Sequence, residues 1–216
     1  FDSSLLAGKD IVAFESMTSN GIEVAVHADI DDEDQTVHFL DIRTTAADKA
    51  DGDKLVTGAE ITVVDEVAYE GLVPGTEYEL KATLVDAETG EPVMVKNGLI
   101  EKQVTGTATF VPEEADGTQV VEIAFDGTGL GSKSLVVYEK LFSADVQLAS
   151  HEDPSDEGQT VTVVEIGTTL VDAGDGDHVI VSGKVKLTDT IEYKGLVAGD
   201  TYTVHGTLMV KSTGEA

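Results

Sequence analysis

The sequence contains no cysteine and no tryptophan, and only 5% of its residues are aromatic. Without cysteine the chain can form no disulfide, no cysteine-ligated zinc site and no thiol nucleophile. Any covalent reinforcement of the fold must therefore join other side chains. No apolar run approaches the roughly 20 residues that a membrane-spanning helix needs, so the sequence predicts a soluble chain without membrane insertion.

Basic residues are also scarce, since 13 Lys and Arg stand against 42 Asp and Glu and give a formal charge of −29. A field of this sign repels phosphate backbones and anionic lipid surfaces, so we expect no nucleic-acid partner and no docking on a membrane. The hydrophobic fraction is still 41%, which is too high for a disordered acidic tail. These numbers predict a folded, strongly acidic protein.

The ends of the sequence carry no targeting signal. The opening FDSSLLAGKDIVAFE lacks a basic leader and a small-residue cleavage site, and the closing KSTGEA lacks an anchor or sorting tail. We interpret the sequence as a segment of something longer.

A repeat with an offset of 124 residues organises the chain. The opening FDSSLLAGKDIVAFE returns as FDGTGLGSKSLVVYE, and HADIDDEDQTV returns as HEDPSDEGQTV, each 124 residues later. Two further stretches return at the same offset. The sequence therefore divides into the C-terminal part of a first unit (1–40), one complete unit (41–165) and the N-terminal part of a third (166–216).

Within a unit the hydrophobic pattern has the period of two that is typical of strands. Apolar and polar residues alternate in VKLTDTIEY at 185–193 and in YTVH at 202–205, and turn clusters such as DAETGEP and EEADGTQ separate such stretches. A unit of about 125 residues is large enough to bury its own core. The pattern predicts an all-β fold of tandem immunoglobulin-like β-sandwich repeats. Because no flexible spacer joins the units, we expect them to stack as a stiff rod.

The same alternation places several polar side chains on the apolar face of their strands. In the complete unit they are Thr44, Asp65, Glu139 and Gln159. Their counterparts in the part-units are Glu15, Gln35, Thr168 and Asp189. A fifth polar residue, His151, is repeated as His27, and alternation does not decide which way it points.

These residue types together suggest acyl transfer. Burying two carboxylates costs several kcal/mol unless they are hydrogen-bonded, protonated or paired, and a proton shared between Asp65 and Glu139 would meet that need. With His151 as proton carrier, Thr44 as nucleophile and Gln159 as electrophile, the product would be an ester, with ammonia lost. Simpler interpretations stay open, because a single Thr, Gln or His is more often a satisfied strand or loop residue and a buried Asp can cap a turn.

Four stretches carry a resemblance to a known family: IRTTAADKADGDK, VVDEVAYEGLVPGTEYELKATLVD, FDGTGLGSKSLVVYEKLF and HEDPSDEGQTV. They resemble the VaFE repeat, the T-Q ester-bond domain of Gram-positive surface adhesins, over residues 41–165 and both flanking part-units. The resemblance implies that a Thr near the start of the domain is esterified, without any enzyme, to a Gln near its end. Carried over by motif, the cross-linked residues are Thr44 and Gln159, and the assisting residues are Asp65, Glu139 and His151.

The nucleophilic Thr and the aromatic residue before Glu139 are the two positions of this resemblance that the motif leaves open. The motif offers two adjacent hydroxyls, and the shared parity with Ile42 favours Thr44 over Thr45. Tyr138 stands where the family name implies Phe, which is a conservative departure, whereas Phe14 in the first unit fits the name.

Other functions remain as alternatives. A Lys–Asn isopeptide domain is disfavoured because Asn20 and Asn97 do not correspond between units, but a Lys–Asp variant stays open. A hydrolase using the same Thr/His/Glu/Asp set predicts an open pocket, whereas the ester predicts a sealed core. A ligand-binding adhesin module is the third alternative. The acidic turns DKADGD, DAGDGD and DIDDED offer oxygen ligands for calcium but lack EF-hand spacing, so we expect no metal and no cofactor.

The sequence thus predicts a structural stalk segment of an extracellular, cell-wall-anchored bacterial adhesin or fibrous surface protein. It predicts no enzyme beyond a single autocatalytic turnover. The expected partners are neighbouring repeats of the same chain, a host or surface ligand bound through domains outside these residues, and other copies if the array assembles into a filament.

Overall fold

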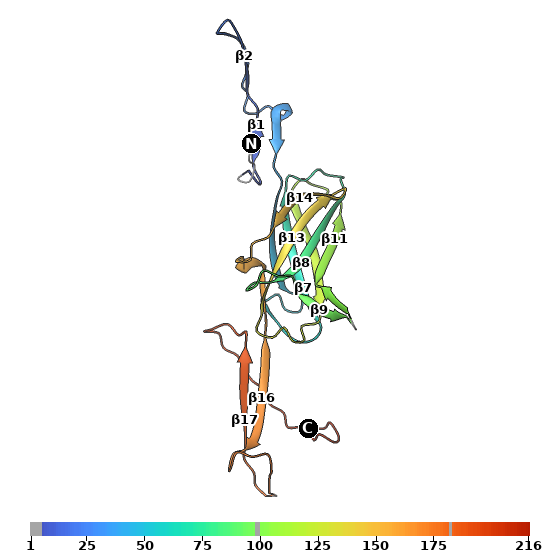
Figure 1. Cartoon of the computed structure of the whole chain (residues 1–216), viewed down its shortest axis with the longest axis vertical. Helices are drawn as coiled ribbons and strands as arrows, with labels where there is room; N and C mark the ends of the chain where they lie inside the picture. The colour runs from blue at the N-terminus through green and yellow to red at the C-terminus, as the bar shows by residue number, and fades with distance from the viewer. Residues whose placement is uncertain (1–5, 98–99, 182) are drawn as a thin grey trace.

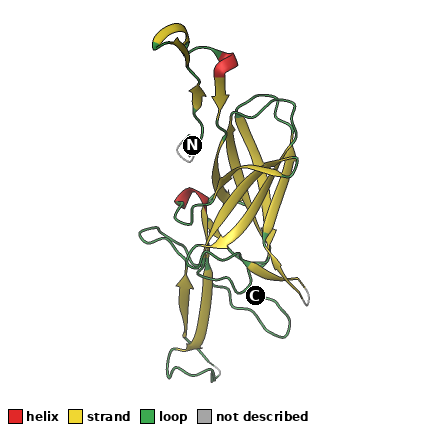
Figure 2. Cartoon of the chain, turned by 45° about the horizontal axis from the view of Figure 1, so that its top comes forward, coloured by secondary structure: helices red, strands yellow, loops and turns green. Residues whose placement is uncertain are grey.

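The computed structural model describes residues 6–97, 100–181 and 183–216. The molecule is elongated, with the first part-unit at one end, a β-sandwich in the middle and the third part-unit at the other end (Figure 1). Strands dominate, which confirms the predicted all-β fold, and the helical structure of the described residues consists of two short 3-10 turns (Figure 2). None of the described residues form a helix long and apolar enough to span a bilayer.

The elements follow the order of the repeat. The first part-unit contains β1 (Asp10–Val12), β2 (Glu15–Ser19), β3 (Ile22–His27), η1 (Glu33–Gln35) and β4 (Thr36–His38). The complete unit contains β5 (Asp41–Asp48), β6 (Leu55–Val56), β7 (Ile61–Glu70), β8 (Tyr78–Asp86), β9 (Met94–Asn97), β10 (Ile100–Gln103), β11 (Thr105–Phe110), β12 (Gly117–Phe125), β13 (Ser134–Ser143), β14 (Val146–His151), η2 (Glu157–Gln159) and β15 (Thr160–Val163). The third part-unit contains β16 (Glu165–Asp172) and β17 (Leu187–Lys194).

Two sheets face each other in the complete unit. One has the order β12-β7-β5, and the other has the order β11-β8-β13-β15-β6, with β14 also paired to β13. The pairs are antiparallel except β6 with β15, which run parallel. Strand β5 is therefore an edge of the first sheet, and β6 with β15 forms an edge of the second.

Alternating burial explains why these sequences form the inner faces of a sandwich. In β7 every second residue from Ile61 to Tyr69 is buried, while most of the intervening side chains remain accessible. The largest fully buried apolar residues come from both sheets and the turn after β7. They are Leu72, Leu80, Leu84, Ile123, Leu135 and Leu141. Each buried Leu or Ile side chain stabilises the fold by about 1.5–3 kcal/mol relative to exposure.

One glycine permits a close approach inside the sandwich. A Cβ atom at Gly106 of β11 would lie 2.6 Å from the carbonyl oxygen of Glu122 and 2.9 Å from side-chain atoms of Ile123. No other residue fits at this distance, because real Cβ atoms do not approach backbone oxygen so closely. Gly106 therefore lets β11 pack directly against β12.

The part-units reproduce the pairing of the complete unit without its burial. Strand β2 pairs Glu15 with His27 as β13 pairs Glu139 with His151, and both hairpins contain a register shift. Strands β16 and β17 likewise repeat the pairing of β5 with β7. Their inner faces are largely exposed, since the described residues contain no counterparts of the strands that cover them in the sandwich.

Two expectations about the part-units are therefore wrong. Asp189, Thr168 and Glu15 were expected to face a core, but all three are exposed because no opposing sheet is present. The strand expected at 202–205 is absent, and these residues are irregular and exposed. Without a neighbouring strand to supply hydrogen bonds, alternation alone does not hold that segment extended.

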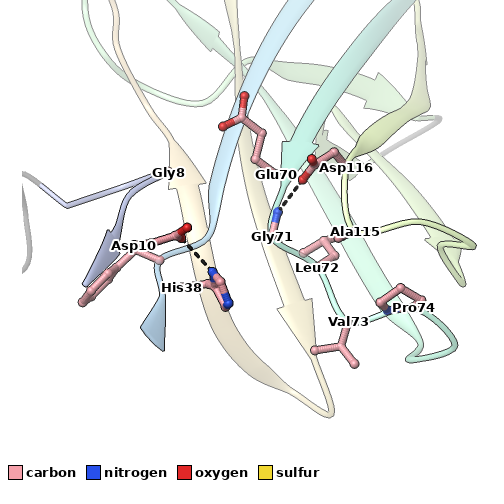
Figure 3. A pocket seen from close by; sticks show the side chains of 11 residues that line it. Gly8, Asp10, His38, Glu70, Gly71, Leu72, Val73, Pro74, Ala115 and Asp116 are labelled. Carbon is pink, nitrogen blue, oxygen red and sulfur yellow. Dashed lines mark hydrogen bonds and ion pairs between the residues drawn. The ribbon is translucent and has the colours of Figure 1, made fainter. Parts of the chain in front are cut away.

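The junctions between units are short, as the sequence predicted. Two residues separate β4 from β5, and one residue separates β15 from β16. A pocket lies at the first junction, where the side chain of His38 contacts Asp10 at 2.7 Å and the Gly71 amide donates to Asp116 at 2.9 Å (Figure 3). This pocket is lined by none of the inward-facing polar residues of the complete unit.

Candidate functional site

Thr44 and Gln159 meet inside the complete unit. Thr44 lies on the inward face of β5 and is 7% exposed, while Gln159 ends η2 and is fully buried. The side-chain Nε2 of Gln159 donates a hydrogen bond to Oγ1 of Thr44. The first strand of the unit thus touches the segment that leads into its last strand, through one hydroxyl and one carboxamide.

Local hydrogen bonds in η2 aim Gln159 into the interior. Asp156 caps the turn, and its Oδ1 accepts a hydrogen bond from the Gly158 amide at 2.7 Å. The Thr160 hydroxyl donates to the Asp156 carbonyl at 2.7 Å on the other side of the turn. Capping of this kind satisfies backbone groups that a short helix leaves unpaired, and it stabilises the turn.

Two carboxyl groups, Asp65 on β7 and Glu139 on β13, face the core from opposite sheets. Both are fully buried, and none of their four oxygens has a hydrogen-bond partner in the described structure. The Thr44 hydroxyl is near enough to favour ionised Asp65, although no hydrogen bond of ordinary geometry joins them. A proton held between the two acids would satisfy one oxygen on each.

The two pKa values are raised to different extents. Burial raises the pKa of Asp65 to about 6, against the opposing effects of the Thr44 hydroxyl, the Glu139 carboxyl and the charges of His151 and Lys54. Burial, followed by the nearby charge of Asp65, raises the pKa of Glu139 to about 9. At neutral pH the pair therefore holds one proton between its two carboxyl groups. An acid and a base lie together beside Thr44.

His151 is held at the edge of this site. It lies opposite Glu139 in the β13–β14 ladder and is half-buried. Its Nε2 is 3.0 Å from Oδ2 of Asp156, and its Nδ1 is 3.4 Å from the Ile42 carbonyl oxygen. Among the described hydrogen bonds none joins His151 to Thr44 or Gln159. A positive charge on His151 would favour ionised Asp65.

Asp156 is a site residue that sequence reasoning missed. The same pair exists in the first part-unit, where Nε2 of His27 lies 2.9 Å from Oδ2 of Asp32. An Asp five residues after the His is visible in both HADIDD and HEDPSD, and this spacing was the available signal.

Lys54 is a second residue near the site that sequence reasoning missed. Its Nζ donates hydrogen bonds to the Ala46 carbonyl and, at 2.6 Å, to the Gly158 carbonyl. Burial lowers the pKa of Lys54, while the charges of Asp156 and Asp65 oppose this change. Comparison of the repeat units did not indicate Lys54, because the residue at the equivalent position 124 residues later is His178.

The remaining residues that the sequence singled out lie elsewhere. Thr45 is exposed on the outer face of β5. Gln35 is half-buried and His27 is exposed. Asp side chains of the DKADGD turn accept hydrogen bonds from backbone amides two residues ahead, as Asp48 does from Ala50 at 2.9 Å. The described residues contain no group of three or more His, Cys, Asp or Glu able to hold a metal ion.

The site therefore combines a hydroxyl nucleophile, a carboxamide, a base and an acid in a core from which water is excluded. This set has the groups that acyl transfer from nitrogen to oxygen requires. Burial also places the reacting groups in contact before any reaction begins, which removes the entropic cost of bringing them together.

A family profile matches the whole chain. The sequence profile described as "T-Q ester bond containing domain" matches residues 1–39, 40–163 and 164–216. No curated protein sequence matches the chain. Among solved structures, a bacterial adhesin from Mobiluncus mulieris containing intramolecular disulfide, isopeptide and ester bond cross-links is similar in two space groups. In P1 it is 12% identical over 72% of this chain and 76% of that chain, with a TM-score of 0.47. In P21 it is 12% identical over 72% and 75%, with a TM-score of 0.46.

Proposed function

The chain belongs to the family of T-Q ester bond containing domains, and on this basis we propose that its complete unit joins Thr44 to Gln159 by an ester formed without any enzyme. The observation that carries the proposal is the contact between Gln159 Nε2 and Thr44 Oγ1 in a core that also buries the carboxyl groups of Asp65 and Glu139. The same contact places the attacking oxygen next to the nitrogen that it replaces.

Groups within the site can give and accept every proton that the reaction moves. Ionised Asp65 accepts the Thr44 proton as Oγ1 attacks Cδ of Gln159, and protonated Glu139 gives its proton to Nε2. The Cδ–N bond then breaks and ammonia leaves. Transfer of the proton from Asp65 to Glu139 restores the pair, so the sum is one hydroxyl and one carboxamide converted to one ester and one ammonia. The charge of Lys54 assists by favouring ionised Asp65, as a proton on His151 would.

Burial favours this reaction over hydrolysis of a diffusible substrate. Thr44, Asp65, Glu139 and Gln159 are each at most 7% exposed, so a substrate from solution has no direct access to the nucleophile. Exclusion of water also protects the ester once it has formed. A hydrolase that uses the same residues would need an opening above Thr44.

We further propose that the chain is a stalk segment of an extracellular bacterial surface adhesin. The cross-link would join β5, the first strand of the unit, to the turn that leads into β15, the last strand. Force that enters at one junction would then pass to the other through a covalent bond and bypass the hydrogen-bonded ladders. Neighbouring repeats are the direct partners, and a surface ligand would be bound by domains beyond these residues.

Intact-mass measurement under denaturing conditions tests the bond. The chain should be lighter than its sequence mass by one ammonia, and a peptide containing residue 44 should remain joined to one containing residue 159 after digestion. Thr44→Ala and Gln159→Ala should show no mass loss, while the matched variant Thr45→Ala should keep it. An unchanged mass in the parent chain contradicts the proposal, and loss of water instead of ammonia identifies a Lys–Asp isopeptide.

A further inference from the structure

The ammonium of Lys54 connects backbone groups on either side of the reacting pair. Lys54 immediately precedes β6, and its Nζ binds the carbonyl oxygens of Ala46 and Gly158. Ala46 lies two residues beyond Thr44 on the same strand, and Gly158 directly precedes Gln159. One side chain thus holds the backbone of the nucleophile and the backbone of the electrophile at the same time.

The sheet topology explains why β5 and η2 need a side chain that connects them. β5 is the edge of one sheet, and η2 lies outside both ladders, so no strand pairing fixes the distance between them. The loop from β5 to β6 carries Lys54 across this gap, and the Lys54 carbonyl accepts a hydrogen bond from the Thr162 amide at 2.7 Å. The backbone of Lys54 is therefore anchored to β15 while its side chain reaches β5 and η2.

The third part-unit contains a related contact at the equivalent position. His178 occupies the position of Lys54, and its Nδ1 lies 3.0 Å from the carbonyl oxygen of Leu170, the counterpart of Ala46. Two chemically different side chains at this position thus contact the same carbonyl of the nucleophile strand. The contact with this carbonyl therefore occurs in both units, with a lysine in one and a histidine in the other.

We propose that Lys54 is a positioning residue for cross-link formation, which holds the Thr44 hydroxyl and the Gln159 carboxamide at reacting distance by binding the Ala46 and Gly158 carbonyls. This inference rests on the proposed ester. Loss of the ammonium would leave the turn that carries Gln159 free to shift relative to β5, and misplacement of reacting groups by about 1 Å can slow a reaction roughly 100-fold. The charge of Lys54 also favours ionised Asp65, so its removal affects the base as well.

The test follows bond formation in the full chain after a short pulse of cell-free synthesis, using intact mass at successive times. Lys54→Met keeps the length of the apolar stem and removes both hydrogen bonds, and we expect its rate of ammonia loss to fall about ten-fold or more. Lys54→Arg should recover most of the rate, because it retains the charge and the donors. Lys49→Met is the matched control, since Lys49 lies in the same loop but pairs with Glu122 on the surface at 2.7 Å.

A pH profile separates positioning from a merely structural effect. In Lys54→Met the acid limb of the rate profile should move to higher pH, because Asp65 loses a nearby positive charge and its pKa rises. The other groups near Asp65 stay in place, namely Thr44, Glu139 and His151, whose Nε2 contacts Asp156. The folded fraction of each variant, measured by circular dichroism on a Thr44→Ala background, corrects the rates for any loss of stability. Lys54→Gln, which retains a neutral donor, should react at an intermediate corrected rate.

The outcomes are distinct. A corrected rate for Lys54→Met equal to that of the parent chain overturns the positioning role, as does equal slowing in Lys49→Met. Slowing in Lys54→Met with recovery in Lys54→Arg supports it. A parent chain that never loses ammonia overturns the cross-link itself, and the positioning role fails with it.

Discussion

The side-chain amide of Gln159 and the hydroxyl of Thr44 are 115 residues apart in the sequence and in contact in the core. An ester between them would close a loop around nearly the whole β-sandwich. In the chain-entropy model made for disulfides, a loop of this size stabilises a fold by about 4–5 kcal/mol through its effect on the unfolded chain. Typical domains have a total stability of about 5–15 kcal/mol, so the bond would be a large part of it.

The first prediction concerns this stabilisation. The cross-linked chain should unfold at a temperature about 10–20 °C above that of Thr44→Ala, as measured by calorimetry at neutral pH. Part of any difference could come from the lost methyl and hydroxyl groups of Thr44, so Gln159→Ala serves as the second unbonded reference. Equal melting temperatures in a chain with confirmed ammonia loss would show that the bond exists without stabilising the fold.

The second prediction uses the chemistry of an ester. Hydroxide cleaves an ester once water reaches it, whereas an amide cross-link resists the same treatment. Prolonged incubation in alkaline denaturant should therefore add one water to the mass of the cross-linked chain and leave an acid at position 159. After refolding, its melting temperature should fall to that of the Thr44→Ala chain. A mass that stays unchanged in alkali would identify a different linkage.

The third prediction concerns the pH dependence of bond formation. Asp65 must be ionised to accept the Thr44 proton and Glu139 must be protonated to supply the leaving group, so the rate should be bell-shaped between about pH 6 and about pH 9. Asp65→Asn and Glu139→Gln should each slow the reaction by at least about 100-fold. Asp86→Asn is the matched control, because Asp86 is also buried but pairs with Lys133 away from the site. An equal effect of all three substitutions would point to folding and not to proton transfer.

The fourth prediction concerns the stability of the unbonded fold. Both acids have pKa values raised on folding, from 3.8 to about 6 for Asp65 and from 4.5 to about 9 for Glu139. The folded state therefore binds more protons than the unfolded state in this range, and stability falls as the pH rises. Thr44→Ala should lose stability between about pH 4 and pH 9 in urea unfolding. The double variant Thr44→Ala/Glu139→Gln should show a weaker pH dependence, because the contribution of Glu139 is removed.

Alternation of apolar and polar residues was sufficient to place the core-facing side chains of the complete unit. In ITVVDEVAY the Asp shares the parity of Ile61, Val63 and Val67, and its side chain is fully buried with theirs. The reason is geometric, since a strand sends every second side chain to the same face whatever its polarity. The same rule separates Thr44 from the exposed Thr45.

Other features of the site lay beyond this rule. Lys54 and Asp156 lie in a loop and a turn, where apolar and polar residues do not alternate, so the sequence pattern did not predict their contacts. Alternation also failed for Asp189 and for residues 202–205, because parity specifies a face but not whether another sheet covers it. Burial is a property of the assembled sandwich and is not carried by a single strand.

The last prediction concerns the turn between β13 and β14. Ala144 and Asp145 there have φ values of 46° and 65°, in the left-handed region that costs about 1–2 kcal/mol for most residues. The equivalent turn of the first part-unit uses Asn20 and Gly21, with φ values of 49° and 78°. Asn-Gly is the preferred pair for a two-residue hairpin of this type, because both residues tolerate positive φ.

Ala144→Asn combined with Asp145→Gly should therefore stabilise the complete unit by about 1 kcal/mol in urea unfolding on the Thr44→Ala background. Gly90→Ala is the converse test, in which backbone strain is added and not removed. Gly90 has a φ of 72°, and no atom lies near the position of its missing Cβ, so the substitution introduces only backbone strain. We expect that substitution to destabilise the fold by a similar amount. A loss of stability in the Asn-Gly variant would mean that the side chain of Ala144 or Asp145 contributes more to the hairpin than its backbone strain removes.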